Sequence, residues 1–179
     1  MSLRKLTMPE LNRLSTEEFR AVEKFPITVI LEDIRSQNNT GSVFRTCDAF
    51  RVEKLYLCGI TAVPPHREIH KTALGAETSV KWKYYDTAKE AILELKKSGH
   101  LILALEHATS SLLLQDYDIP ENSKIVLVFG NEIHGVSEEV LQLADACLEI
   151  PQFGTKHSIN VSVAVGITLW EIVKKIQNH

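Results

Sequence analysis

The chain has 179 residues, of which 44% are hydrophobic and 24% are charged, and its formal net charge is −3. A chain of this length and apolar content can bury the core of one compact domain. No run approaches the ~18 consecutive apolar residues of a membrane-spanning helix, so we expect no membrane segment. The negative net charge excludes a protein whose whole surface is a basic face for nucleic acid, and any such contact must be local.

The cysteines and the start of the chain indicate a cytoplasmic protein. Cys47, Cys58 and Cys147 are odd in number and lack zinc-ligand spacing, which favours reduced thiols in a core. The first residues lead into polar sequence without an apolar signal region, so we do not expect secretion. His66 and His70 lie four residues apart, but no further ligands complete a metal site, and we predict none.

In chain order, the first predicted element is a helix from Pro9 to Lys24, with a capping box over residues 15–18. Strands are predicted near 27–32, 53–58, 80–85, 101–106, 124–129 and 146–150. Helices are predicted near 41–50, 66–75, 86–98, 137–144 and 158–177. This alternation predicts an α/β fold with a mainly parallel six-stranded sheet and flanking helices. Residues 1–26 are expected to form a helical extension and residues 27–179 the main domain.

Three polar loops follow predicted strands. The first holds Asn39-Thr40-Gly41-Ser42-Val43-Phe44-Arg45, the second holds Gly130-Asn131-Glu132-Ile133-His134-Gly135, and the third runs from Pro151 to Asn160. In open parallel sheets, ligands bind beyond the carboxyl ends of the strands. The sequence therefore predicts that these three loops form one composite site.

Ser158 and Asn160 are predicted to open the last helix. Serine is a favoured N-cap, and apolar residues follow at helical spacing from Val161 to Ile172. A helix start has unpaired backbone N–H groups and is suited to a ligand. The alternative is that Ser158 only caps the helix.

Together the three segments resemble the SpoU/TrmH family of RNA ribose 2′-O-methyltransferases, in the SPOUT superfamily. The first family motif, Asn-x-Gly-x-x-x-Arg, is met by Asn39, Gly41 and Arg45. The second, Gly-x-Glu-x-x-Gly, is met by Gly130, Glu132 and Gly135. The third, Ile-Pro and then Ser-Leu-Asn-Val-Ser, is met by Ile150-Pro151 and Ser158-Ile159-Asn160-Val161-Ser162, where isoleucine replaces leucine at similar volume. The resemblance covers residues 27 to 176.

The resemblance implies a deep trefoil knot in the last third of the chain, whereas general folding rules favour an unknotted doubly wound sheet. It implies that S-adenosylmethionine binds against the knot, held by backbone groups near Leu105, Gly130, Ile150 and Ile159. It also implies a homodimer with the active site at the subunit interface, formed partly by the first motif and the last helix. Phe44 and Trp170 are candidate interface anchors, with core packing as the alternative.

The implied chemistry is attack of a ribose 2′-hydroxyl on the methyl group of the cofactor, which needs no metal. Arg45 is proposed in the family to remove the proton, but an arginine pKa exceeds ~12. We therefore expect Arg45 to hold a phosphate and stabilise developing negative charge. By the same resemblance, Asn39 helps to hold Arg45 and the ribose, Glu132 orders the second loop, and Ser158 and Asn160 hold the catalytic loop and the substrate.

Two sets of basic residues are candidates for RNA contacts. The set that we predict to bind RNA lies in the middle of the chain and comprises Arg67, Lys71, Lys81 and Lys83. The second set, in the N-terminal segment, comprises Arg4, Lys5, Arg13, Arg20 and Lys24. Because glutamates interleave with the second set, it reads as an ordinary solvated surface.

Within the family, residues 105–111 and 169–171 are most similar to the branch that methylates guanosine 18 in the D-loop of tRNA. Ribosomal RNA or another tRNA ribose is the alternative substrate. A hypothesis of another class is a non-catalytic RNA-binding or assembly factor, which the intact motif residues disfavour. A dinucleotide-dependent oxidoreductase is excluded, because no Gly-x-Gly-x-x-Gly follows the first strand.

Overall fold

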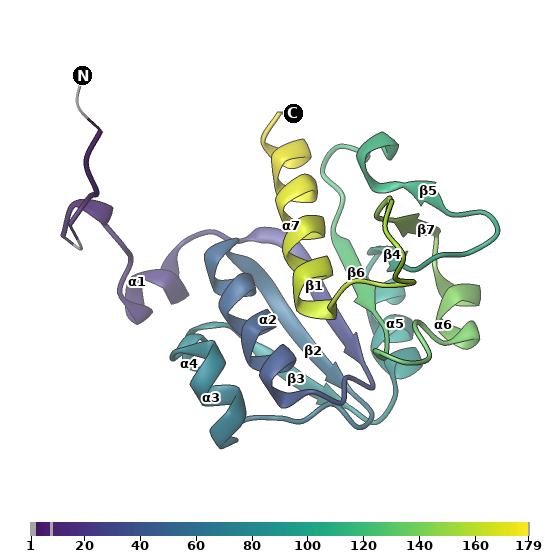
Figure 1. Ribbon diagram of the computed structural model, residues 1–179, viewed down its shortest axis with the longest axis horizontal. Coiled ribbons are helices and arrows are strands. Elements are labelled where there is room, and N and C mark those ends of the chain that lie inside the picture. The colour runs from purple at the N-terminus through teal and green to yellow at the C-terminus, as the bar shows by residue number, and fades with distance from the viewer. Residues whose placement is uncertain (1–2, 8, 179) are drawn as a thin grey trace.

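Seven parallel strands form one sheet in the computed structural model, which describes residues 3–7 and 9–178 (Figure 1). The order of the strands is β3-β2-β1-β6-β4-β7-β5. Their bounds are β1 Phe25–Glu32, β2 Val52–Cys58, β3 Trp82–Tyr85, β4 Leu101–Leu105, β5 Leu112–Leu113, β6 Ile125–Phe129 and β7 Ala146–Glu149. The α/β class and all six predicted strands are confirmed. The count of six is wrong, because β5 adds a two-residue strand within the stretch expected to be irregular.

Helices cover both faces of the sheet, with α2 and α7 on one face and α5 and α6 on the other (Figure 1). Their bounds are α1 Thr16–Ala21, α2 Gln37–Ala49, α3 Arg67–Ala73, α4 Ala76–Ser79, α5 Ala88–Lys97, α6 Glu138–Leu143 and α7 Val161–Gln177. Alternate residues of β1 serve the two cores: Val29 packs with the cluster under α2 and α7, and Ile30 packs with the cluster under α5 and α6. This period of two is what a strand buried on both faces requires.

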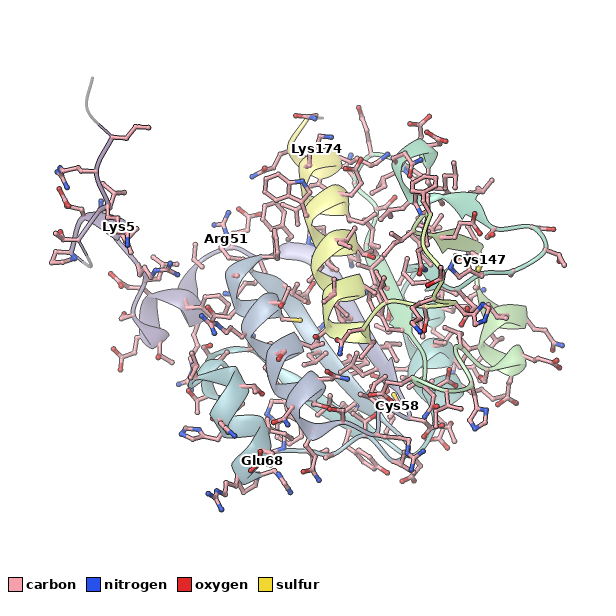
Figure 2. All side chains as sticks on the ribbon, in the orientation of Figure 1. Lys5, Arg51, Cys58, Glu68, Cys147 and Lys174 are labelled. Atoms are coloured by element: carbon pink, nitrogen blue, oxygen red, sulfur yellow. The ribbon has the colours of Figure 1, made fainter. Side chains whose placement is uncertain are left out.

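The N-terminal segment is less helical than predicted. In place of one helix from Pro9 to Lys24, it contains a short 3-10 helix, Pro9–Leu11, and the six-residue α1. The predicted capping box is confirmed, because the Ser15 hydroxyl accepts from the Glu18 amide and the Ser15 amide donates to the Glu18 carboxylate. Asn12 adopts a left-handed φ of 44°, which breaks the helix between them. Figure 2 shows this segment leading away from the body of the domain toward Lys5.

The last helix begins one turn later than Ser158. Asn160 is its N-cap, and the Asn160 Oδ1 accepts from the Ser162 amide at 2.8 Å. Ser158 lies instead in the irregular loop before the helix. The prediction that Ser158 opens this helix is therefore wrong, and the loop that follows β7 is longer than expected.

The strands at one edge of the sheet lie in an order that suits a threaded chain. β7 pairs with β4 on one side and with β5 on the other, although β4 and β5 are joined by a loop. After β7 the chain continues into α7, which packs against α2. Near the end of α7, the Lys175 ammonium donates to the carbonyls of Gln115 and Tyr117, which lie in the connection from β5 to β6. The trefoil knot that the resemblance implies stays a prediction.

Gly41 of the first motif lies where α2 crosses α3. A Cβ added there would stand 2.1 Å from the Thr72 Oγ1 and 2.4 Å from the Ile69 carbonyl oxygen. The neighbouring Thr72 hydroxyl also donates to the Asn38 carbonyl at 3.0 Å. The glycine thus allows two helices to pack in direct backbone contact, and this fixes the start of α2.

We expect Gly41→Ala to destabilise the protein by about 2 kcal/mol, because the added methyl group meets the backbone of α3. Chemical denaturation measures the free energy of unfolding. Gly166→Ala in α7 is the matched control: nothing lies within 4 Å of its added Cβ, so it should stabilise the helix by about 0.5–1 kcal/mol. Equal effects of the two changes would contradict the close approach at Gly41.

Candidate active site

The Glu132 carboxylate joins the second motif to the first. Its oxygens accept from the backbone amides of Arg35 at 3.0 Å and Ser36 at 3.2 Å, and from the Asn39 side-chain amide at 3.1 Å. Arg35 and Ser36 immediately precede α2, where backbone N–H groups lack helical partners. Glu132 therefore supplies the negative charge that this helix start favours and holds the loop after β6 against it.

Asn39 extends the same chain of hydrogen bonds to the third motif. Its Oδ1 accepts from the Asn160 Nδ2 at 3.0 Å, and Asn160 is the N-cap of α7. The loops that follow β1, β6 and β7 are thus linked through Glu132, Asn39 and Asn160. Their sequence separations of 93 and 121 residues mean that only the folded sheet brings them together.

The second motif requires its two glycines because the loop folds back on itself. A Cβ on Gly130 would lie 2.2 Å from the Gly135 carbonyl oxygen, and Gly135 itself has a φ of 69°. Asn131 supports the turn: its Oδ1 accepts from the amides of Ile133 and His134. Gly130 was expected to let the backbone approach a cofactor, and the structure adds this closure of the loop as a second reason for glycine.

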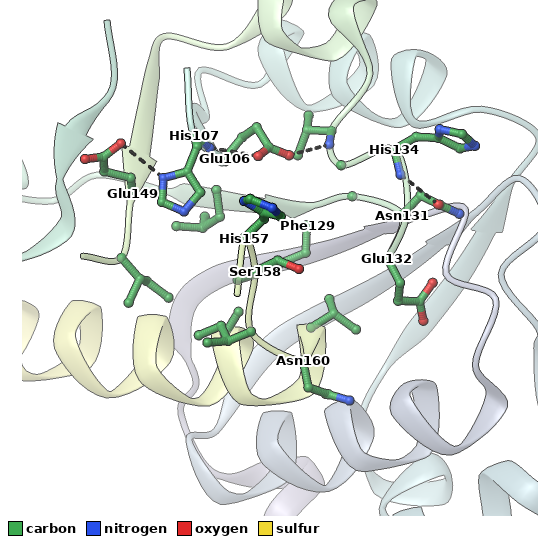
Figure 3. A pocket seen from close by; sticks show the side chains of 18 of the residues that line it. Glu106, His107, Phe129, Asn131, Glu132, His134, Glu149, His157, Ser158 and Asn160 are labelled. Atoms are coloured by element: carbon green, nitrogen blue, oxygen red, sulfur yellow. Dashed lines mark hydrogen bonds and ion pairs between the residues drawn. The ribbon is translucent and has the colours of Figure 1, made fainter. Parts of the chain in front are cut away.

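A cavity of about 650 Å³ lies beyond the carboxyl ends of β4, β6 and β7 (Figure 3). The residues expected to hold the cofactor all line it, namely Leu105, Gly130, Ile150 and Ile159. Three residues with expected catalytic roles line it as well, namely Glu132, Ser158 and Asn160. The volume lies within the range of small-molecule sites, about 300–1,000 Å³.

Sequence reasoning missed two carboxylates of this cavity. Glu106 accepts from the Val136 amide at 2.9 Å, and so holds the far end of the second loop. Glu149 accepts from the Ser111 hydroxyl and lies 3.4 Å from the His107 Nδ1 (Figure 3). Glu106 directly follows β4, and Glu149 is the last residue of β7. Their positions at the ends of predicted strands could have marked them as site residues.

The charge of the cavity is negative. Glu106, Glu132 and Glu149 line it together with three histidines, and no lysine or arginine of the described residues does so. Such walls favour a cationic ligand over a polyanion. The cavity by itself is therefore suited to a sulfonium group and unsuited to an RNA phosphate.

Glu132 is held in its charged form. Partial burial raises its pKa, but the amides of Arg35 and Ser36 and the Asn39 side chain outweigh this effect, so that its pKa lies below the usual range. A carboxylate whose lone pairs accept N–H groups is a weak base. Glu132 therefore orders the loops and is not suited to remove a proton.

Arg45 does not reach this cavity in the same chain. It follows Asn39 by six residues on α2, which places the two side chains about 120° apart around the helix and about 9 Å apart along it. Its exposed side chain lines a separate cleft between α2 and the N-terminal segment. The structure thus brings four of the five predicted catalytic residues together and leaves Arg45 apart.

The predicted RNA-binding residues also lie away from the cavity. Arg67 and Lys71 belong to α3, and Lys81 and Lys83 belong to the region of β3, the strand at the other end of the sheet. Lys71 lies 3.9 Å from Glu68, and Lys83 lies 3.2 Å from Glu94, so carboxylates partly neutralise this surface. Phe44 is fully buried in the core, whereas Trp170 is 64% exposed and packs edge-on against Phe50.

Among residues 3–7 and 9–178, no group of three or more potential metal ligands is found. Within the same residues, no helix is long and apolar enough to cross a membrane.

The sheet and the cavity define an α/β enzyme that binds its ligand beyond the carboxyl ends of parallel strands. The chain belongs to the SpoU rRNA Methylase family, whose sequence model matches residues 26–170. It is similar to the tRNA (guanosine(18)-2′-O)-methyltransferase of Aquifex aeolicus, with 33% identity over 151 residues, 81% of this chain and 67% of that protein.

Two solved structures are similar to the whole domain. The A. aeolicus TrmH/SpoU tRNA modifying enzyme superposes with a TM-score of 0.80 at 29% identity, covering 91% of this chain and 83% of that one. The AdoMet-bound rRNA methyltransferase of Sinorhizobium meliloti superposes with a TM-score of 0.77 at 26% identity, covering 87% of this chain and 59% of that one. The chain is therefore a methyltransferase, and its methyl donor is S-adenosylmethionine.

We expect the contribution of Glu132 to stability to depend on pH. Because its pKa is lowered on folding, the contribution is complete above its unfolded pKa of about 4.3 and is lost as the pH falls through the folded value. Urea unfolding between pH 3 and pH 7 should show wild type more stable than Glu132→Gln at neutral pH, with a gap that closes below about pH 4.

Glu121→Gln is the matched control, because this exposed carboxylate lies before β6, at the opposite end of the sheet. Its difference from wild type should stay small at every pH. A gap for Glu132→Gln that stays constant down to pH 3 would contradict the role of the charge.

Proposed function

We propose that this chain transfers a methyl group from S-adenosylmethionine to the ribose 2′-oxygen of RNA, and that its substrate is guanosine 18 of tRNA. The observation that carries the proposal is the hydrogen-bonded series Glu132, Asn39 and Asn160 at the rim of an acidic cavity. The name of the A. aeolicus relative, which covers four fifths of this chain, supports the choice of nucleotide. The division into an extension of residues 1–26 and a catalytic domain of 27–179 is part of the proposal, since the family match begins at residue 26.

Binding of the donor is assigned to the cavity. Backbone groups near Leu105, Gly130, Ile150 and Ile159 would hold its adenosine part, and the carboxylates of the walls would favour its positive charge. When bound, the donor supplies a methyl group on sulfur with a neutral sulfide as the leaving group. The contribution of the protein is to align the 2′-oxygen with that methyl group and to stabilise the oxygen as it loses its proton.

Asn39, Ser158 and Asn160 are proposed to position the ribose beside the donor. The Asn39 and Asn160 side chains are fixed by each other and by Glu132, so that their orientation does not have to be ordered when substrate binds. The 2′-oxygen forms a bond to the methyl carbon, the carbon–sulfur bond breaks with its electron pair staying on sulfur, and the hydroxyl proton passes to solvent water. Glu132 is not its acceptor, because its lone pairs already accept three N–H groups.

Arg45 is proposed to come from a second copy of the chain. In one chain it points away from the acidic cavity, which has no cation to face an RNA phosphate. A homodimer through α2 and α7 would bring the Arg45 of one copy toward the cavity of the other. Support comes from the unpartnered apolar stripe of α7, in which Val163, Ile167 and Trp170 are 51%, 40% and 64% exposed.

Ribosomal RNA is the second candidate substrate. The name of the matching family and that of the S. meliloti structure both refer to rRNA. A non-catalytic RNA-binding factor is the other alternative and would bind donor and RNA without turnover.

The proposal further includes the trefoil knot and a cytoplasmic location, the latter supported by free thiols at Cys47, Cys58 and Cys147.

The test is transfer of labelled methyl from S-adenosylmethionine to unmodified tRNA and, separately, to ribosomal RNA, with mapping of the modified nucleotide. Label at guanosine 18 is the expected result. Label confined to ribosomal RNA would retain the enzyme and overturn the substrate. Binding of both donor and RNA without any label would overturn the catalytic proposal.

We expect Arg45→Ala to lower turnover by about 10²- to 10³-fold, the usual effect of removing a group that stabilises developing negative charge. Donor affinity, measured by calorimetry, should not change, because the donor is proposed to be held by groups of the cavity lining and Arg45 is proposed to face the RNA. Arg45→Lys should recover only part of the activity, because an ammonium lacks the planar fork of a guanidinium. Lys97→Ala, an exposed cation at the end of α5, is the control, and an equal loss there would assign the effect to general charge.

A further inference from the structure

A second cleft of about 560 Å³ lies between the N-terminal segment and helices α2 and α4. One wall is formed by residues 12–16 and 19, and the other by residues of α2 and of the region from Ala73 to Ser79. Arg20 fixes this arrangement, because it donates from α1 to the Thr78 carbonyl at 2.6 Å. Phe19 is buried beneath the cleft, so the N-terminal segment is anchored here although its leucines are exposed.

Three arginines line the cleft, namely Arg13, Arg45 and Arg51, against one carboxylate, Asp48. Within the described parts of the chain, none of these arginines lies within 4 Å of a carboxylate. Asp48 is itself engaged, since one of its oxygens accepts from the Ser79 hydroxyl. Among the described residues, the three guanidinium groups therefore lack a carboxylate partner, although Arg51 also lies over the ring of Phe25.

The glutamates that interleave with these cations in the sequence do not neutralise the cleft. Glu10 pairs with Arg4 at 2.6 Å, and Glu18 accepts from the Ser15 amide in the capping box. Neither Glu17 nor Glu23 lines the cleft. The interleaved glutamates therefore do not face Arg13, and its role in RNA binding stays a prediction.

Further cations border the same region. Lys24 precedes β1, Arg51 precedes β2 and Lys81 precedes β3, so all three lie at the amino ends of neighbouring strands. The parallel pairing of these strands brings the three cations to one edge of the sheet, and burial, followed by the charges of Lys81 and Arg51, lowers the pKa of Lys24. In Figure 2, Arg51 lies on the side of the domain from which the N-terminal segment departs.

We propose that this cleft binds the phosphodiester backbone of the RNA substrate, with Arg13 and Arg51 holding phosphates along a path that leads to Arg45. The proposal rests on the proposed function, because it assigns a course to the same substrate. Guanidinium forks match phosphate oxygens in pairs, and arginines without a carboxylate partner have no ion pair to break when phosphate binds. The acidic cavity would receive the donor, and the basic cleft would receive the polyanion.

The test is equilibrium binding of fluorescent unmodified tRNA to Arg13→Gln/Arg51→Gln over a range of salt concentrations. Loss of two phosphate contacts should weaken binding by about tenfold. The slope of log K against the logarithm of the salt concentration should become less steep by about 1 to 2. Methyl transfer should show a raised KM for tRNA with kcat nearly unchanged, because neither residue belongs to the cavity. Donor affinity by calorimetry should stay unchanged and reports correct folding.

The matched control is Lys89→Gln/Lys97→Gln. Both lysines are exposed and belong to α5, which covers the face of the sheet opposite to α2 and the cleft. They remove the same charge, and their tRNA affinity should stay within twofold of wild type. Lys71→Gln/Lys83→Gln, from the surface predicted by sequence, should behave like this control.

Equal weakening by all three pairs would overturn the cleft and leave a general charge effect. Wild-type affinity in Arg13→Gln/Arg51→Gln, with wild-type methylation intact, would overturn the cleft while the proposed function stands. The binding measurement does not depend on methyl transfer. Failure of the wild-type protein to methylate any RNA would therefore count against the proposed function and not against the cleft. Arg51 stacks on Phe25, so Arg13→Gln alone, expected to weaken binding about threefold, keeps the test valid if the double variant unfolds.

Discussion

The site depends on one carboxylate that accepts three N–H groups. Glu132 lies on the loop after β6, and its partners are two amides before α2 and the Asn39 side chain. These hydrogen bonds to a charged acceptor hold the loop after β6 against the start of α2 and fix their relative orientation. Through Asn39 the constraint reaches Asn160 and the start of α7. The sheet order, with β6 between β1 and β4, is what places these loops side by side.

The donor cavity and the N-terminal cleft carry charges of opposite sign. The cavity beyond β4, β6 and β7 contains carboxylates and no lysine or arginine, whereas the cleft beside the N-terminal segment contains three arginines. A net charge of −3 therefore does not argue against an RNA substrate, because binding responds to local potential. In the proposed arrangement, one copy of the chain supplies the donor site, and the RNA site needs the Arg45 of a second copy.

The sequence predicted what depends on local periodicity and motif order. Strands buried on both faces are continuous apolar runs, and glycine, asparagine and glutamate at their ends marked the site. The N-cap of the last helix is Asn160, although Ser158 was also predicted to open it. Both residue types are good caps, and only the length of the loop after β7 decides between them. The two-residue β5 has no periodicity to detect, and it forms because β7 pairs with it. Arg13 and Arg51 lack carboxylate partners because nearby glutamates such as Glu10 and Glu18 bind other groups. Sequence spacing does not show which partner a glutamate takes.

In the proposed site, the donor cavity of one copy works with the Arg45 of another. Differently tagged Arg45→Ala and Asn160→Ala chains, co-expressed and purified as a mixed dimer, test this arrangement by tRNA methylation. Each variant alone should be nearly inactive. A mixed dimer contains one cavity with intact Asn160 facing an intact Arg45, so about half of wild-type activity is expected. Activity no higher than that of either parent would show that both residues act within one chain and would overturn the shared site.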